Sequence, residues 1–386
     1  MALNTVSSDR LSTNVKNTNF TSAEKQDLTN DILPLAGQLG NRNLIINGAM
    51  NVAQRGTSST GLGASAGYFT LDRYRATFSS TAGRLTMSQV ADVHDGFANA
   101  MKLECTTADT SIGSSEYFIL QHKFEGQDLQ QLKKGSSDAE EFTVSFYVKG
   151  NANATYVVEM YDLDNNRQVG KTFSVTTSWT RVVLTFPADT TGALDDDNAA
   201  SLQLGIWLHA GSNYTSGTLA TSWVSNVSAQ RAGGITSFFD STDRTFFLTG
   251  LQMEVGSVAT DFEHRSFGQE LALCQRYYQT IGVGFITACR GASSSQLLYS
   301  YTPPVNMRAS PTISTTATGF HSSFGVRSYR DGSGTSDSTT TPATVSLYWQ
   351  EINPTIHLTQ TGFSVTDDRS ATIFVNGGAI TLSAEL

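Results

Sequence analysis

Short stretches of alternating apolar and polar residues recur along the chain, and turn residues separate them. Alternation puts the apolar side chains on one face of a strand. A spacing of about 8–15 residues between such stretches is typical of a β-sandwich or jelly roll. We therefore predict a mainly β protein whose first domain, residues 41–265, is a jelly-roll β-sandwich. Its predicted strands are 85–90, 100–105, 118–124, 141–148, 155–161, 170–175, 180–186, 202–208 and 244–248.

A second β-rich region occupies residues 281–386. Pro303-Pro304 and the Gly/Ser/Thr-rich stretch 331–341 interrupt it as loops. We predict a second β-sandwich-like domain there. Its predicted strands are 284–289, 296–302, 312–316, 343–349, 355–359, 362–366 and 372–375.

A linking helix is predicted between the two domains, over residues 266–280. Ser266 with Gln269 forms a capping-box pattern. Leu271, Cys274 and Tyr278 then recur at helical spacing. The strand ahead of this helix loses its alternation once, at Gly250. The helix either closes the base of the sandwich or brings three copies of the chain together through Leu271, Cys274 and Tyr278, and we favour the second.

The first 40 residues differ from the rest. Residues 1–19 are polar, but Leu28, Ile32 and Leu35 form an apolar stripe behind a capping box at Thr21. A helix this short is marginal alone in water. We predict a segment, residues 1–40, that docks on another protein or assists oligomerisation. The alternative is an arm that lies on its own domain.

Charge and composition exclude several classes of protein. The net charge of −9 and the pI of about 5.1 argue against a nucleic-acid partner, because phosphate binding needs a basic face. No run approaches the roughly 18 apolar residues of a membrane-spanning helix, so we predict no membrane insertion. The three cysteines form no CxxC pair, and we expect buried thiols.

We predict no enzymatic activity. The acidic clusters Glu140-Glu141 and Asp195–Asp197 are interpreted as solvated turns, since consecutive acids rarely form a matched acid/base pair. The six histidines fall in no recognisable catalytic motif. The run Asp162–Asn166 carries oxygen ligands that calcium prefers, but it lacks the glycine and final glutamate of an EF-hand, and a hairpin turn is favoured.

Several stretches resemble known proteins. The sequences LTGLQMEVGSVATDFEHRSFGQELALCQRYY (248–278), NLIINGAMNVAQRG (43–56) with Asp72-Arg73-Tyr74, and TPPVNMRASPTIS (302–314) resemble tail fibres and other appendages of tailed bacteriophages. Tyr74 stands where those proteins often have Trp. The pieces 173–188, 201–211 and 246–256 resemble carbohydrate-binding modules of the galactose-binding jelly-roll type.

The resemblance implies a structural protein of the virion, made in the host cytoplasm. The protein that it implies is a tail fibre or similar appendage that contributes to host-surface attachment. It also implies a homotrimer, docking on tail or capsid proteins through the N-terminal segment, and no cofactor beyond a structural calcium that the sequence does not locate. Three alternatives remain: a capsid-bound or tail-nozzle component without receptor contact, a polysaccharide-degrading fibre, and a free-standing carbohydrate-binding module, in which the N-terminal segment has no role. The second is disfavoured because long solenoid repeats are absent from the sequence.

Saccharide binding is the remaining hypothesis for a ligand. Sugars stack on exposed aromatic rings beside polar side chains. Four aromatic residues in predicted loops are the candidates, and each is equally compatible with partial burial: Tyr214, Trp223, Tyr329 and Trp349. Trp179 and Trp207 lie in strand patterns, and we predict that they belong to the core.

Overall fold

The computed structural model describes residues 41–92, 94–282, 286–293, 296–315, 324–329, 335–338, 345–350, 353–361, 370–375 and 379–386. The predicted docking segment, with Leu28, Ile32 and Leu35, lies outside these residues. In residues 286–293 and 296–300, and in the strands between 324 and 375, the backbone pairing alone is described.

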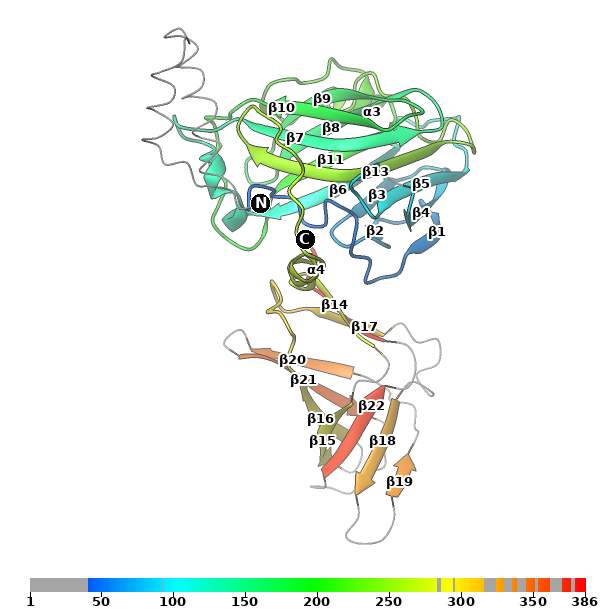
Figure 1. Ribbon diagram of the computed structural model, residues 1–386, viewed down its shortest axis with the longest axis vertical. Coiled ribbons are helices and arrows are strands. Elements are labelled where there is room, and N and C mark those ends of the chain that lie inside the picture. The colour runs from blue at the N-terminus through cyan, green and yellow to red at the C-terminus, as the bar shows by residue number, and fades with distance from the viewer. Residues whose placement is uncertain are drawn as a thin grey trace, which may run out of the picture.

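The first domain is a sandwich of two antiparallel sheets (Figure 1), as predicted. One sheet has six strands, in the order β1 (Ser58–Leu62), β4 (Arg84–Val90), β5 (Ala100–Thr107), β13 (Thr245–Val255), β7 (Phe142–Gly150) and β10 (Thr180–Phe186). The other has seven, in the order β12 (Val224–Ser225), β9 (Arg167–Val175), β8 (Ala154–Asp162), β11 (Ala200–Ala210), β6 (Tyr117–Glu125), β3 (Arg75–Ser79) and β2 (Gly67–Tyr68).

The chain crosses repeatedly from one sheet to the other, which gives the jelly roll. For example, β5 is followed by β6 in the other sheet, and β7 then returns to the first. Short helices lie in the connections: η1 (Gly126–Asp128), η2 (Gln130–Leu132), α3 (Ser212–Thr215) and η3 (Ser228–Gln230).

The predicted alternation places the core between the sheets. Along β11, Leu202, Leu204 and Ile206 point into the main core. Gln203 and Trp207 therefore face outward, because side chains alternate across a strand. Trp207 is nevertheless fully buried, in a second, smaller apolar cluster on the outer face of the seven-stranded sheet.

The break in alternation at Gly250 is a β-bulge. The pairing of β13 with β7 shifts register between Thr249 and Gln252. Gly250 lies there with φ of +62°, in the left-handed region. A Cβ on this glycine would lie 2.6 Å from the ring of Phe97 and 2.9 Å from that of Tyr147, so the close approach also requires glycine.

The linking helix is shorter than predicted. Helix α4 spans Phe267–Gln275, and its predicted capping box is present, with Ser266 and Gln269 bonded to each other's backbone. Tyr278 does not lie on the helix. It begins strand β14 (Tyr278–Ile281), which pairs with β23 (Ile380–Ser383), and β23 in turn pairs with β17 (Thr312–Thr315).

The rest of the second β-rich region forms a seven-stranded antiparallel sheet beyond this three-stranded one (Figure 1). Its order is β19 (Thr335–Ser338), β18 (Phe324–Tyr329), β22 (Ser370–Val375), β15 (Ile286–Ser293), β16 (Gln296–Tyr301), β21 (Asn353–Thr361) and β20 (Val345–Gln350).

The sandwich and the three-stranded sheet meet at a charged contact that we call the joint. Glu385 accepts from Arg73 at 2.6 Å and pairs with Arg55 at 3.1 Å. The two guanidinium groups lie over neighbouring rings, Arg73 at 3.4 Å from the centroid of Tyr277 and Arg55 at 3.5 Å from that of Tyr278. Residues from the end of the described chain thus clamp the start of β14 against the sandwich.

Two further pairs complete the joint. Arg276 donates twice to the buried carboxylate of Glu125, at 2.8 and 2.6 Å. Arg308 and Asn198 exchange hydrogen bonds, each side chain donating to the other's carbonyl oxygen at 2.6 and 2.8 Å. Because bidentate and reciprocal contacts fix orientation as well as distance, the joint holds the two parts in one arrangement.

Candidate functional site

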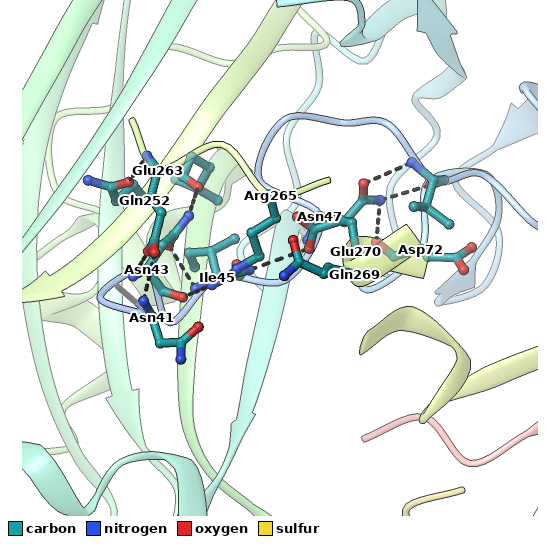
Figure 2. Close-up of polar contacts among 12 residues, drawn as sticks. Asn41, Asn43, Ile45, Asn47, Asp72, Gln252, Glu263, Arg265, Gln269 and Glu270 are labelled. Carbon is teal, nitrogen blue, oxygen red and sulfur yellow. Dashed lines mark hydrogen bonds and ion pairs between the residues drawn. The ribbon is translucent and has the colours of Figure 1, made fainter. Parts of the chain in front are cut away.

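Two of the stretches that resemble phage fibres lie side by side in the structure (Figure 2). The carboxylate of Glu263 accepts from the backbone amides of Asn41 and Asn43, at 2.7 and 2.8 Å. Arg265 donates to the carbonyl oxygens of Asn43 and Ile45. These charged groups satisfy backbone groups of a segment that belongs to neither sheet, so residues 41–45 are held by the tether ahead of α4.

Asn47 is the centre of this contact. It is fully buried with φ of +63°, and its backbone amide donates to Glu270 of α4 at 2.6 Å. Its side-chain amide donates to the carbonyls of Val52 and Asp72 and accepts from the amide of Val52, at 2.8–3.0 Å. The Asn47 side chain therefore joins its own loop to the loop of Asp72, and its backbone amide joins both to helix α4. This region is a structural junction, since its described polar groups bond to one another.

The predicted sugar contacts Tyr214 and Trp223 are half-buried and occupied within the chain. Tyr214, in α3, packs against Trp207 and Tyr117 with centroids at 5.2 and 5.4 Å. Trp223 packs on the main core, donates to the carbonyl of Pro187 at 2.8 Å, and has Lys134 over its ring. The structure does not bring the two residues together in one aromatic cluster.

Tyr329 lies in a strand, so the prediction that it belongs to a loop is wrong. Trp349 also lies in a strand, which agrees with the predicted strand 343–349 and not with its choice as a loop residue. Tyr329 is the last residue of β18, and Trp349 lies in β20 where the pairing with β21 shifts register. Their strands are not neighbours in the sheet.

Of the two tryptophans predicted in the core, Trp207 is confirmed as buried, although in the outer cluster. Trp179 is half-buried and lies in the turn directly before β10, not in the core. Its ring packs near Phe247, and Lys149 lies over both rings at 5.3 and 4.8 Å. The ring faces of Trp179 and Phe247 are therefore already in contact with another side chain of this protein.

A polar surface on the seven-stranded sheet was not predicted. Strand register places Gln203 between Tyr161 and Lys123, and Gln121 beside Arg75 in the next row. We call these five residues the amide face. Gln203 and Gln121 are 5% and 7% exposed, whereas the other three stand half-exposed around them. Amides donate and accept hydrogen bonds, so this floor has the chemistry that sugar hydroxyls require.

A buried ion pair borders the amide face. Arg231 donates to both oxygens of Glu159 at 2.6 and 2.7 Å, and the indole of Trp207 donates to the same carboxylate at 2.9 Å. Arg231 also lies over the ring of Tyr161, at 4.6 Å from its centroid. Burial, with the nearby charges of Arg75 and other arginines, lowers the pKa of Lys123. The face is locally positive on an acidic protein.

The register that creates this face depends on residues far apart in sequence. The strands β6, β8 and β11 each alternate clearly, but alternation within a strand does not determine which strands pair or in which register. A sequence signal was present in the amides themselves, because Gln121 and Gln203 occupy the polar positions of their strands.

The proposed helix contacts between chains are placed differently from the prediction. Cys274 and Tyr278 are buried within the single chain, and Leu271 is half-buried. The exposed large apolar residues of α4 are Phe267 and Leu273, at 59% and 36%. Cys274 faces the chain's own interior because the helix packs its Cys274 and Glu270 side inward.

The acidic stretches are structural or solvated, as predicted. Residues Asp195–Asp197 are exposed. Asp162–Asn166 joins β8 to β9 as a hairpin, with Asn166 at φ of +53°. Asp162 is held there by Lys134 and by the side chain of Asn165. The two cysteines whose side chains are described, Cys105 and Cys274, are buried free thiols. Within the described part of the chain, no helix is long and apolar enough to cross a membrane.

Comparison with known proteins gives structural similarity alone. No protein-family description matches the sequence, and no curated protein does. The chain is similar in structure to the family 11 carbohydrate-binding module of a Clostridium thermocellum cellulase, with 12% identity, 54% of this chain and 98% of that one covered, and a TM-score of 0.26.

It is also similar to a family 61 module in complex with β-1,4-galactotriose, with 10% identity, coverage of 56% and 99%, and a TM-score of 0.29. A family 30 carbohydrate-binding module matches with 12% identity, coverage of 60% and 96%, and a TM-score of 0.30. The jelly roll itself is defined by the strand order and pairing described above.

Proposed function

We propose that this chain is a structural protein of a tailed-phage virion, a tail fibre or similar appendage, without enzymatic activity. The joint is the observation that carries the proposal. An appendage that holds a distal domain at a defined place on a particle needs its domains in a fixed relative orientation. Here Glu385, Arg73, Arg276 and Glu125 fix the sandwich to the next sheet through charged contacts that are largely buried.

The sequence resemblance supplies the assignment to phage appendages, and the structure adds a reason for it. The resembling stretches 248–278 and 43–56 are the ones that build the junction of Figure 2. They define how the sandwich connects to the second β-rich region, which is the property that appendage proteins would share. Labelling virions with a gold-conjugated antibody to the sandwich tests this role. Label on the tail fibres is expected, label on the capsid or tail nozzle favours the alternative, and unlabelled virions would overturn the proposal.

We propose the amide face as the surface that contacts host saccharide. It replaces Tyr214 and Trp223, whose rings are engaged within the chain. The binding mode is hydrogen bonding from Gln121, Gln203 and Lys123, with Tyr161 at the edge. Weak contacts of this kind gain strength from several copies on one particle.

Affinity electrophoresis against a panel of bacterial surface polysaccharides tests the contact. Gln203→Ala and Gln121→Ala are expected to abolish retardation by the polysaccharide that retards the wild type. Thr86→Ala, on the six-stranded sheet, is the control and is expected to leave it unchanged. Equal retardation of all variants would place the saccharide contact elsewhere on the protein. That result would not bear on the role in the virion, which the antibody labelling tests independently.

The homotrimer is part of the proposal. Since Cys274 and Tyr278 are buried within one chain, the helix offers Phe267 and Leu273 to a second copy. The solution mass of the full chain and of a chain lacking residues 1–40 separates the cases. A trimer in both places assembly in the helix and β-domains. A trimer lost on truncation places it in the N-terminal segment, and a monomer in both would overturn self-assembly.

A further inference from the structure

Three metal-ligating side chains converge at one end of the sandwich. Asp109 lies in the loop after β5, Glu116 immediately precedes β6, and His209 lies near the end of β11. One ligand atom from each lies within 4.8 Å of the others. Asp109 and His209 are buried and Glu116 is nearly so, with 14% of its side chain exposed. Groups brought together from three separate segments make a built cluster rather than a run of neighbouring acids.

Two buried atoms in this cluster face each other without a hydrogen-bond partner among the described residues. They are Nε2 of the fully buried His209 and Oε2 of Glu116, which lie 3.6 Å apart. An unpaired polar atom in a dry site costs free energy and calls for an explanation. The separation exceeds a hydrogen bond but leaves room for an ion that both atoms could ligate.

One tautomer of His209 suits a metal ligand at Nε2. Nδ1 lies 2.8 Å from the hydroxyl of Ser237, and that hydroxyl oxygen also accepts from the amide of Phe239 at 3.1 Å. When the Ser237 oxygen accepts from Nδ1–H as well, Nε2 carries a lone pair directed at the carboxylates. A lone pair facing a carboxylate is repulsive unless a cation lies between them.

Asp109 is oriented in the same way. Its Oδ2 accepts from the hydroxyl of Thr81 and from the amide of Ala82, both at 2.8 Å. The amide of Asp109 donates to the carbonyl of Phe239, in the segment that also carries Ser237. Metal ligands are commonly held by such outer hydrogen bonds, which fix the ligand atoms before the ion arrives.

We propose that Asp109, Glu116 and His209 bind one divalent transition-metal ion of the zinc class. Two carboxylates and a neutral imidazole balance its charge, and water completes the coordination. Imidazole nitrogen suits zinc and its neighbours, whereas calcium takes oxygen ligands. The site is therefore distinct in chemistry from the structural calcium that the sequence resemblance implies. Its effect would be to fasten the β5–β6 loop to the end of β11.

Metal content tests the site directly. The full chain is loaded with excess Zn²⁺ and desalted, and its bound zinc is quantified by elemental mass spectrometry. The wild type is expected to retain one zinc per chain, and His209→Gln and Glu116→Gln to lose it. His94→Gln, which changes a histidine between β4 and β5, is the matched control and is expected to retain one. Loading with Ca²⁺ is expected to leave no retained ion.

X-ray absorption at the zinc edge of the loaded wild type needs no variant. It is expected to show nitrogen and oxygen ligands with one imidazole, and no sulfur at about 2.3 Å, which excludes the cysteines. A folded wild type that retains no zinc would overturn the proposal, as would sulfur ligation. Retention of zinc by His209→Gln, or retention of Ca²⁺ in preference to Zn²⁺, would also overturn the proposal.

Discussion

The guanidinium of Arg73 lies over the ring of Tyr277, 3.4 Å from its centroid, while its Nη1 donates to Glu385 at 2.6 Å. Arg73 is 1% exposed and has φ of +72°, so both its side chain and its backbone are committed to this position. Burial lowers the pKa of Arg73, but Glu385 and neighbouring tyrosines raise it further, and the group stays charged. In this part of the joint, one carboxylate therefore serves two arginines.

Removal of that carboxylate should loosen the joint. Glu385→Gln leaves Arg73 buried with less compensation, and breaking a buried pair costs about 3 kcal/mol. Backbone amides of β14 should then exchange with deuterium roughly 100-fold faster, since 1.4 kcal/mol is a factor of ten. Glu140→Gln removes an exposed pair with Lys133 and should change exchange little. Equal effects from the two variants would show that burial does not strengthen this contact.

Asp72 should make stability fall as pH rises. Burial raises its pKa to about 6, against the opposing contacts of Gln54 and Arg55. The native state then binds more protons than the unfolded state between pH 3.8 and about 6, so the free energy of unfolding decreases across that window. Two units correspond to about 3 kcal/mol. Urea unfolding of wild type and Asp72→Asn at pH 4 and pH 7 measures this, and the wild type should lose more stability than the variant. A loss of the same size in both would assign the dependence to other groups.

Asn47→Ala should destabilise the sandwich by about 3 kcal/mol. It removes three buried hydrogen bonds, and it places alanine, which tolerates the left-handed region less well than asparagine, at a positive φ. Asn41→Ala is the matched control. It also has positive φ, at +57°, but it is exposed, so about 1 kcal/mol is expected. Thermal unfolding compares the two. If Asn41→Ala costs as much, the backbone conformation and not the hydrogen bonds sets the effect.

Gly250→Ala should cost more than Gly256→Ala, although both glycines have positive φ. The added methyl at 250 meets Phe97 and Tyr147, whereas nothing lies within 4 Å at 256. We expect about 3 kcal/mol at 250 and about 1 kcal/mol at 256 from the strain and overpacking terms. The double variant Gly250→Ala with Phe97→Ala should recover part of the difference. Additive losses would show that Phe97 is not the obstacle.

The sequence was sufficient where structure depends on neighbouring residues. Alternation predicted the sandwich strands, the run Asp162–Asn166 predicted a hairpin, and Ser266 with Gln269 predicted the start of α4. The slip at Gly250 also corresponded to a real bulge. Each of these features is set within a few residues, by side-chain periodicity or by hydrogen bonds to nearby backbone groups.

The sequence was insufficient where distant segments decide the structure. Tyr278 continues the helical spacing, yet it becomes a strand because residues 380–383 pair with it. Tyr214 and Trp223 lie in loops by composition, but Trp207 and the core cover one side of each. The convergence of Asp109 and Glu116 on His209 depends on which strands end together, and the amide face depends on the register of three strands.

The order of residues in the joint also bears on how the chain is made. Strand β23 and Glu385 come after every element that they hold, and Arg55, Arg73 and Tyr278 all precede them by more than 100 residues. While the protein emerges from the ribosome, the sandwich is complete well before its clamp exists. The nascent chain therefore carries two arginines without their carboxylate until the last strand arrives. A slow or interrupted translation would prolong that state, in which the sandwich is folded but not yet fixed to the three-stranded sheet.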